Sequence, residues 1–246
     1  VGAAPFLGAA TRTTNVHAGS VVTHSMRTIT ILAIERLVSA AIEWLPQYAA
    51  SAPRGQKRHK YTDIIILENS YFLYNALEER KPTLAQRLAP MASRAINEIF
   101  DTACRHIPEM QEMHRRHRTN YVAWLIEEEW EQLQRFFADV ERMEAKVTAA
   151  NVRPNLALPS NKVLPRDGSC KVMIQASVKH MAGRVAKHFS SETQLQSSVW
   201  AEVTAAAVRE WGRFATLAHD CYAITLWPSA EDLEGTMEGF GESFAT

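Results

Sequence analysis

The chain has 246 residues, of which 46% are hydrophobic, and this is enough to form one large or two small globular cores. The 27 Lys and Arg residues balance 27 Asp and Glu residues, so the chain lacks the strongly basic composition that is typical of nucleic-acid-binding domains. Three cysteines favour a reducing compartment over a disulfide framework. We find no signal peptide and no apolar run near the ~20 residues that cross a bilayer. The composition therefore predicts a cytoplasmic globular protein whose membrane contact, if any, is peripheral.

The first half of the chain is predicted to form helices separated by proline. Residues 1–23 are rich in Gly, Ala and Thr, which indicates a flexible lead-in or linker. Helical periodicity follows until Pro46 disturbs it. A second, nearly buried helix is predicted over residues 61–79, because apolar residues occur on most of its sides. Pro82 is predicted to begin a third helix, since proline fits the first position of a helix.

Residues 112–149 are predicted to form one uninterrupted helix of ~55 Å, because they contain neither Pro nor Gly. Its packing seam follows alternating three- and four-residue steps, and Phe136 is expected to be a buried part of it. The seam consists of Val122, Ile126, Leu133, Phe136, Val140, Met143 and Val147. Trp130 and Phe137 widen the apolar face, which indicates two neighbouring helices rather than one.

The next stretch combines a linker and a basic helix. Residues 151–169 contain three prolines, so helix is not expected there and a hinge is predicted. Residues 171–188 have the periodicity of an amphipathic helix. Ser190 or Ser191 is predicted to cap the helix that follows.

The last long helix is predicted to run to about Tyr222, with Glu210 as the polar position in its seam. The apolar positions of that seam are Trp200, Val203, Ala207, Phe214, Leu217 and Cys221. Ser229, with Asp232 three residues later, resembles a capping box for a short final helix. That helix is expected to fray near Gly241.

These elements predict an all-α fold, an elongated bundle of about six or seven helices with a helical-rod architecture. After the lead-in, the domains expected are a helical bundle over residues 24–150, the Pro-rich linker over 151–169 and a C-terminal helical bundle over 170–246.

Two groups of residues were considered for metal binding or catalysis. The first is Cys104, His106, His114 and His117, in which the last two share a helix face. It lacks the spacing of known zinc motifs, and three neighbouring arginines would repel a cation. The second is Glu127, Glu128, Glu129 and Glu131, whose consecutive positions point around a helix instead of converging on a substrate. With no phosphate loop or nucleophile elbow either, we predict no catalytic, cofactor or metal residues.

Glu129 and Glu210 are different, because each interrupts an apolar seam. A carboxylate at such a position is either buried, where it fixes the register or pairs with a base, or simply exposed. The sequence leaves both interpretations open.

The region around the basic helix carries six bases against one acid, Asp167. The bases are Lys162, Arg166, Lys171, Lys179, Arg184 and Lys187. Lys171, Lys179, Arg184 and Lys187 are the candidate contacts with an acidic partner or with anionic lipid. We favour protein over lipid as the partner, although a plain solvated face is the simpler interpretation because the bases are spread around the helix.

Several stretches resemble the C-terminal part of the exocyst component Sec-three. They are the segment Lys60-Tyr-Thr-Asp-Ile-Ile-Ile-Leu-Glu-Asn-Ser-Tyr-Phe72, residues 121–141 with Phe136-Phe137-Ala-Asp-Val-Glu141, Asn161-Lys162, Lys187-His188 before Ser191-Glu192, Val199-Trp200, and Cys221-Tyr222. The resemblance covers roughly residues 31–237, but the linker 151–169 and the basic loop 51–60 have no counterpart in the family's pattern.

This resemblance implies a non-enzymatic helical-rod tether of the CATCHR type, a subunit of the complex that holds secretory vesicles at the plasma membrane before exocytosis. It implies other exocyst subunits as partners, small GTPases through regions outside this chain, and a cytoplasmic location at membrane sites of secretion. The alternatives are another CATCHR-type tether and, in a different class, a helical metal-binding enzyme.

Overall fold

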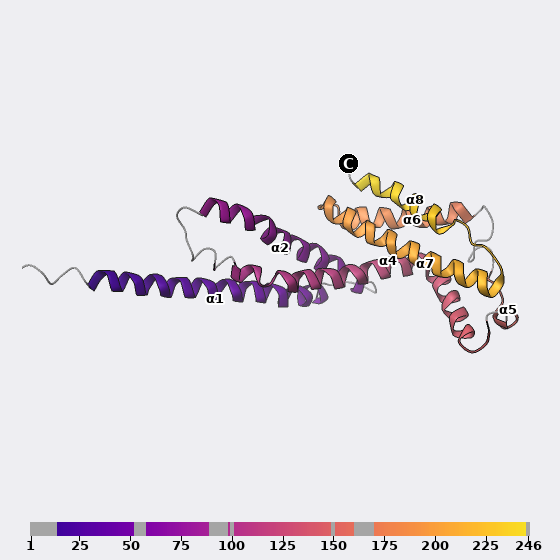
Figure 1. The fold of residues 1–246 in the computed structure, drawn as a ribbon, viewed down its shortest axis with the longest axis horizontal. Coiled ribbons are helices and arrows are strands. Elements are labelled where there is room, and N and C mark those ends of the chain that lie inside the picture. The colour runs from indigo at the N-terminus through magenta and orange to yellow at the C-terminus, as the bar shows by residue number, and fades with distance from the viewer. Residues whose placement is uncertain are drawn as a thin grey trace, which may run out of the picture. The chain divides into compact units, whose positions relative to one another are not determined.

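The computed structural model describes residues 14–51, 58–88, 98, 101–148, 151–159 and 170–244, and these ranges contain helices and no strand (Figure 1). The helices are α1 (Thr14–Ser51), α2 (Arg58–Leu88), α4 (Ile107–Glu144), α5 (Val152–Asn155), α6 (Cys170–His188), α7 (Thr193–Tyr222) and α8 (Ala230–Gly241), followed by the 3₁₀ turn η2 (Glu242–Phe244). The all-α prediction is confirmed, whereas the elongated arrangement stays a prediction. Within the described ranges, no helix has the length and apolarity needed to span a bilayer.

The chain divides into two compact units. One comprises Val1–Ser51 and Asn69–Glu112, and the other comprises Ala52–Glu68 and Met113–Thr246. Two of the three boundaries between the units fall inside α2 and α4, and the third follows the end of α1 at Ser51. The division into four segments expected from the sequence stays a prediction.

Three predicted helix boundaries in the first half are wrong. Helix α1 begins at Thr14, inside the predicted lead-in, and it continues through Pro46 to Ser51. Burial on both sides of the proline, at Leu45 and Ala49, offsets the lost backbone hydrogen bond. Helix α2 likewise does not end before Pro82 but runs to Leu88. Of the predicted third helix, residues 98 and 101–104 are helical, and most of the rest lies outside the described residues.

Helix α4 lies five residues earlier in the chain than predicted and is less regular. It begins at Ile107, so that Pro108 occupies its first turn, where a missing N–H has no consequence. At Trp130 the backbone leaves the helical region, with φ −122° and ψ 23°, and the helix ends at Glu144. The prediction of one uninterrupted helix over residues 112–149 is therefore wrong. The bend coincides with the burial of the Trp130 ring, which lies 5.6 Å from Trp211.

In the second half, α8 packs on both α6 and α7. Two buried indoles of α7 hold it there, since Trp200 Nε1 donates to the Met237 carbonyl at 2.9 Å and Trp211 Nε1 donates to the Pro228 carbonyl at 2.7 Å. A Cβ at Gly241 would lie 2.9 Å from the Trp200 ring, so this close approach requires glycine. The predicted fraying near Gly241 is wrong, because η2 continues the chain.

The predicted caps differ in outcome. The cap at Ser229 is confirmed, because the Asp232 N–H donates to Ser229 Oγ at 3.1 Å. The cap at Ser190 or Ser191 is wrong, since Glu192 occupies the N-cap of α7 without a side-chain bond. A turn in which the Glu192 N–H donates to the Phe189 carbonyl places both serines before the cap. In the predicted Pro-rich linker, α5 forms one helical turn, and residues 160–169 lie outside the described part.

Candidate functional site

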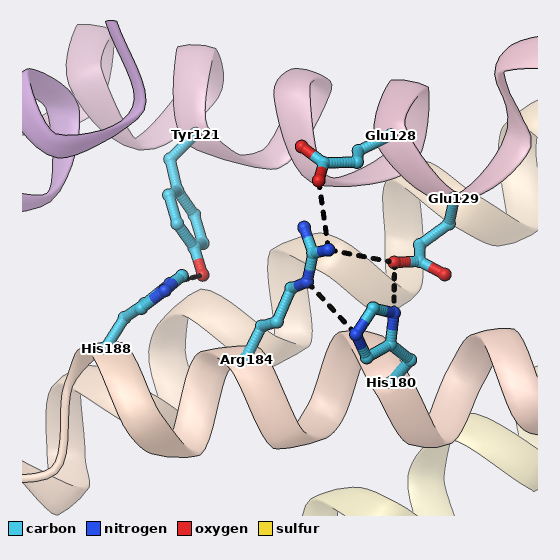
Figure 2. A network of polar contacts seen from close by, with 6 residues as sticks. All are labelled: Tyr121, Glu128, Glu129, His180, Arg184 and His188. Atoms are coloured by element: carbon cyan, nitrogen blue, oxygen red, sulfur yellow. Dashed lines mark hydrogen bonds and ion pairs between the residues drawn. The ribbon is translucent and has the colours of Figure 1, made fainter. Parts of the chain in front are cut away.

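A network of polar contacts joins helix α4 to helix α6 (Figure 2). Tyr121, Glu128 and Glu129 come from α4, and His180, Arg184 and His188 come from α6. On α6 the three bases are four residues apart, so they lie along one side of the helix. Tyr121 and Glu128 are seven residues apart, so they also lie along one side of α4.

Arg184 is the centre of this interface. Its Nη2 lies 3.0 Å from Glu128 Oε1 and 3.9 Å from Glu129 Oε1. Its guanidinium also lies over the Trp124 ring, 5.4 Å from the ring centroid. The side chain is 18% exposed, so its charge is directed into the interface rather than toward solvent. An arginine that faces both a carboxylate and an aromatic ring holds the two helices in one register.

Glu129 answers a question that the sequence left open. Its side chain is 10% exposed, and its Oε1 lies 2.6 Å from His180 Nδ1. His180 itself is 58% exposed, so the acid of this pair is much less accessible to solvent than the base. The polar position in the α4 seam is thus mostly covered and paired with a base from a different helix.

Tyr121 and His188 form the third contact of the interface. The Tyr121 hydroxyl and His188 Nδ1 form a hydrogen bond of 2.9 Å. Burial raises the pKa of Tyr121, so the hydroxyl keeps its proton. The Tyr121 ring is fully buried, with its centroid 5.2 Å from that of Phe189. This residue therefore combines a hydrogen bond with core packing.

A cleft of about 230 Å³ lies beside the bend of α4. Trp130 and Leu133 line it from α4, and Met173, Ile174 and Ser177 line it from α6. Glu128, Glu129, Glu131 and Gln132 of α4 line it as well, so its walls combine apolar and polar side chains. The carboxylates of Glu128 and Glu129 are bound to bases of α6.

A second set of polar contacts joins α4 to α7. Glu210 accepts from Arg213 Nη2 at 2.7 Å and from Arg213 Nε at 3.0 Å, and Gln134 Nε2 donates to it at 3.2 Å. Arg213 Nη1 reaches Glu141 at 2.5 Å. Glu210 is 22% exposed, so the second carboxylate that interrupts a seam is also paired with a base.

The residues considered for metal binding have separate partners. His114 is buried, and its Nδ1 lies 3.4 Å from the Leu67 carbonyl of α2. His117 Nδ1 lies 2.6 Å from Asp63 Oδ1, also on α2. In the described part of the chain, no group of three or more His, Cys, Asp or Glu residues is arranged to hold a metal ion. His114 and His117 join α4 to α2 instead.

The four candidate contact residues of the basic helix have different surroundings. Lys179 and Lys187 are exposed, whereas Arg184 is bound to Glu128. Nothing is described for the Lys171 side chain. Lys179 and Lys187 are therefore the described candidates that are available to a partner.

The predicted α4 seam has four buried members, Val122, Ile126, Leu133 and Val140, while Phe136, Met143 and Val147 are only half-buried. The fully buried ring is that of Phe137, which stacks on Phe214 of α7 with centroids 4.6 Å apart. The expectation that Phe136 is a buried seam residue is thus wrong. The buried residues Ile126, Trp130, Leu133, Phe137 and Val140 follow four- and three-residue steps, so the seam passes through Trp130 and Phe137 instead of Glu129 and Phe136.

Sequence reasoning gave Tyr121 and His188 no role of their own, and it assigned Arg184 to a surface. A weak signal was present, since the bases of α6 and the acids of α4 have opposite charge and helical spacing. Which helices lie side by side could not be read from either segment alone. Chemically, the arrangement holds helices together, because each carboxylate at its centre is bound to a base rather than directed toward an open site.

The comparisons with known proteins agree with this architecture. The family model described as "Exocyst complex component Sec3, C-terminal" matches residues 19–223. No curated protein and no solved structure matches the chain. The family match includes most of α1 and all of the α4/α6 interface.

Proposed function

The chain belongs to the family of the C-terminal region of exocyst complex component Sec3, and we propose that it is a non-enzymatic scaffold in vesicle tethering. In this role it contributes helices to the exocyst at sites where secretory vesicles are held at the plasma membrane before fusion. The observation that carries the proposal is the family match, which extends over residues 19–223.

The α4/α6 interface supports a scaffold rather than an enzyme. A tether must keep its helices in register while it connects other molecules, and paired charges with restricted solvent access favour one register. Arg184, Glu128 and Glu129 supply such pairs. The other subunits of the complex are the partners that this role requires.

For the outer face of α6, we propose contact with an acidic protein surface rather than with lipid. Each base near an anionic leaflet contributes about 1 kcal/mol, so a pair of lysines gives weak attachment at physiological salt. Lys179 and Lys187 are exposed, and Arg184 has its charge neutralised by Glu128. A protein partner can place carboxylates directly opposite two lysines, which a fluid bilayer does less well.

The test of the tethering role is to tag the full-length protein in its own cells, purify it and identify its partners by mass spectrometry. We expect the other exocyst subunits, and we expect secretory vesicles to accumulate when the protein is depleted. Purification without any exocyst subunit would contradict the proposal.

The α6 surface is tested with Lys179→Glu/Lys187→Glu in the same purification. Lys146→Glu/Arg209→Glu is the matched control, because both of its positions are also exposed bases. We expect loss of one or more subunits from the first variant only. In parallel, liposome co-sedimentation at low and moderate salt addresses lipid. Strong binding that persists at moderate salt and disappears in Lys179→Glu/Lys187→Glu would contradict a protein partner.

A further inference from the structure

Helix α1 has two apolar faces, and one of them is open to solvent. Ile42, Leu45 and Ala49 are buried on one side. On another side, large apolar residues are exposed over the length of the helix that has described side chains. The most exposed are Ile29 at 59%, Leu37 at 69% and Trp44 at 56%. Exposed large side chains in a continuous row mark a surface that binds another protein.

The exposed positions follow the spacing of a helix–helix seam. The row, which we call the α1 outer seam, consists of Ile29, Ala33, Leu37, Ala40, Trp44 and Tyr48. Its steps are four, four, three, four and four residues, so its members share one side of the helix. The Trp44 and Tyr48 rings are stacked on each other, with centroids 4.6 Å apart. The shape that fits such a row is a second helix lying nearly parallel or antiparallel to α1.

The order of large and small residues in the α1 outer seam is self-complementary. The spacing is the same when the row is followed in either direction. If two copies of α1 lie antiparallel about a two-fold axis near residue 38, Leu37 of each copy faces Ala40 of the other. In the same arrangement Ala33 faces Trp44. Each large side chain next to the axis thus meets a small one, which allows the helices to approach closely.

The charges beside the seam fit the same arrangement. Between residues 28 and 51, Arg36 and Glu43 are the exposed charged residues, and both lie on the same flank of the α1 outer seam. A two-fold axis brings the same flanks of two antiparallel helices together. With a rise of ~1.5 Å per residue, Arg36 of one copy and Glu43 of the other differ by about 3 Å in height along the helix axis. The pairing therefore forms two symmetric ion pairs and no contact between like charges.

We infer that the α1 outer seam binds a second copy of this chain, in an antiparallel pair that is centred between Leu37 and Ala40. The inference does not depend on the proposed tethering role, because it concerns the isolated chain. The seam is about 30 Å long, so the dimer is weak and forms in the micromolar range or above.

The experiment is sedimentation equilibrium of the full chain across the micromolar range. We expect a reversible monomer–dimer equilibrium and more than tenfold weaker association for Leu37→Asp. Phe72→Asp is the matched control, because Phe72 is 63% exposed but lies on a different helix, α2. Circular dichroism confirms that both variants keep their helix content. A monomer at every concentration, or a dimer that is unaffected by Leu37→Asp, overturns the inference.

Charge reversal tests the antiparallel register. Arg36→Glu and Glu43→Arg should each weaken the dimer about threefold or more, since two ion pairs become two repulsive pairs. The double variant Arg36→Glu/Glu43→Arg should restore the affinity of the original chain. Failure of the double variant to restore what both single variants lose overturns the proposed register.

Discussion

Helix α4 contacts α7 through buried aromatic rings as well as ion pairs, whereas its side-chain contacts with α6 include those of Arg184, His180 and His188. Toward α7 it buries aromatic rings, with Phe137 stacked on Phe214 and Trp130 placed 5.6 Å from Trp211. Toward α6 it presents carboxylates to Arg184 and His180. Aromatic burial contributes most of the stability of such a bundle, whereas partly exposed ion pairs contribute little energy but permit one register. The difference indicates that α7 holds α4 in place and that α6 fixes its alignment.

The largest expected effect comes from removing an aromatic ring from the contact between α4 and α7. Phe137→Ala should lower the free energy of unfolding by about 3–5 kcal/mol, because the ring is fully buried. Phe136→Ala is the matched control and should cost roughly 1–2 kcal/mol, since that ring is half-buried. Urea denaturation measures both. Equal losses at the two positions would mean that the predicted seam through Phe136 is the true one.

On the polar side, Arg184→Ala should lower the free energy of unfolding by about 1–2 kcal/mol, because it removes the ion pair with Glu128, the weaker one with Glu129 and the contact with Trp124. The control is Arg135→Ala, which breaks an exposed pair with Glu131 and should change stability by less than about 0.5 kcal/mol. Thermal unfolding of both variants under identical salt conditions checks this. A loss at Arg184 as large as that at Phe137 would remove the distinction between the two interfaces.

The contact of α4 with α2 adds a dependence on pH. Burial, assisted by the charge of Arg118, lowers the pKa of His114 to about 4, against the hydrogen bond with the Leu67 carbonyl. Between about pH 6.5 and pH 4 the unfolded chain binds a proton at this position and the folded chain does not, so stability falls with pH in that window. Below about pH 4, His114 is protonated in both the folded and the unfolded chain, so it causes no further change of stability with pH.

Melting temperatures from pH 7 to pH 4 test this expectation. His114→Gln should lessen the decline on acidification, whereas His219→Gln, at an exposed position, should leave it unchanged. Parallel declines in the original chain and in His114→Gln would show that His114 is not the group responsible.

The smallest effect concerns the exposed end of the polar interface. His180→Ala should change the free energy of unfolding by less than about 1 kcal/mol, because the imidazole is 58% exposed although its partner Glu129 is mostly covered. A double-mutant cycle with Glu129→Gln measures the coupling directly. A coupling energy well above that value would place His180, and not Arg184, at the centre of the interface.

Some features of this protein follow from the sequence alone. The spacing of the hydrophobic residues was sufficient to predict the all-α class and to place α6 and α7 nearly to their ends. The local sequence was also sufficient to predict the cap at Ser229. These features are local, since a helix depends on residues three and four positions apart and a cap depends on one turn. The scattered positions quoted for the resemblance were also sufficient to predict the exocyst family that the family match shows.

Other features were decided by the tertiary structure. Pro46 and Pro82 did not end their helices, and α4 bends at Trp130 although it has neither proline nor glycine there. Arg184 was predicted at the surface, but its neighbours are the carboxylates of a helix about 56 positions earlier in the chain. The physical reason is the same each time. Packing energy between distant segments exceeds local preference, and a single segment contains no information about which partner will cover it.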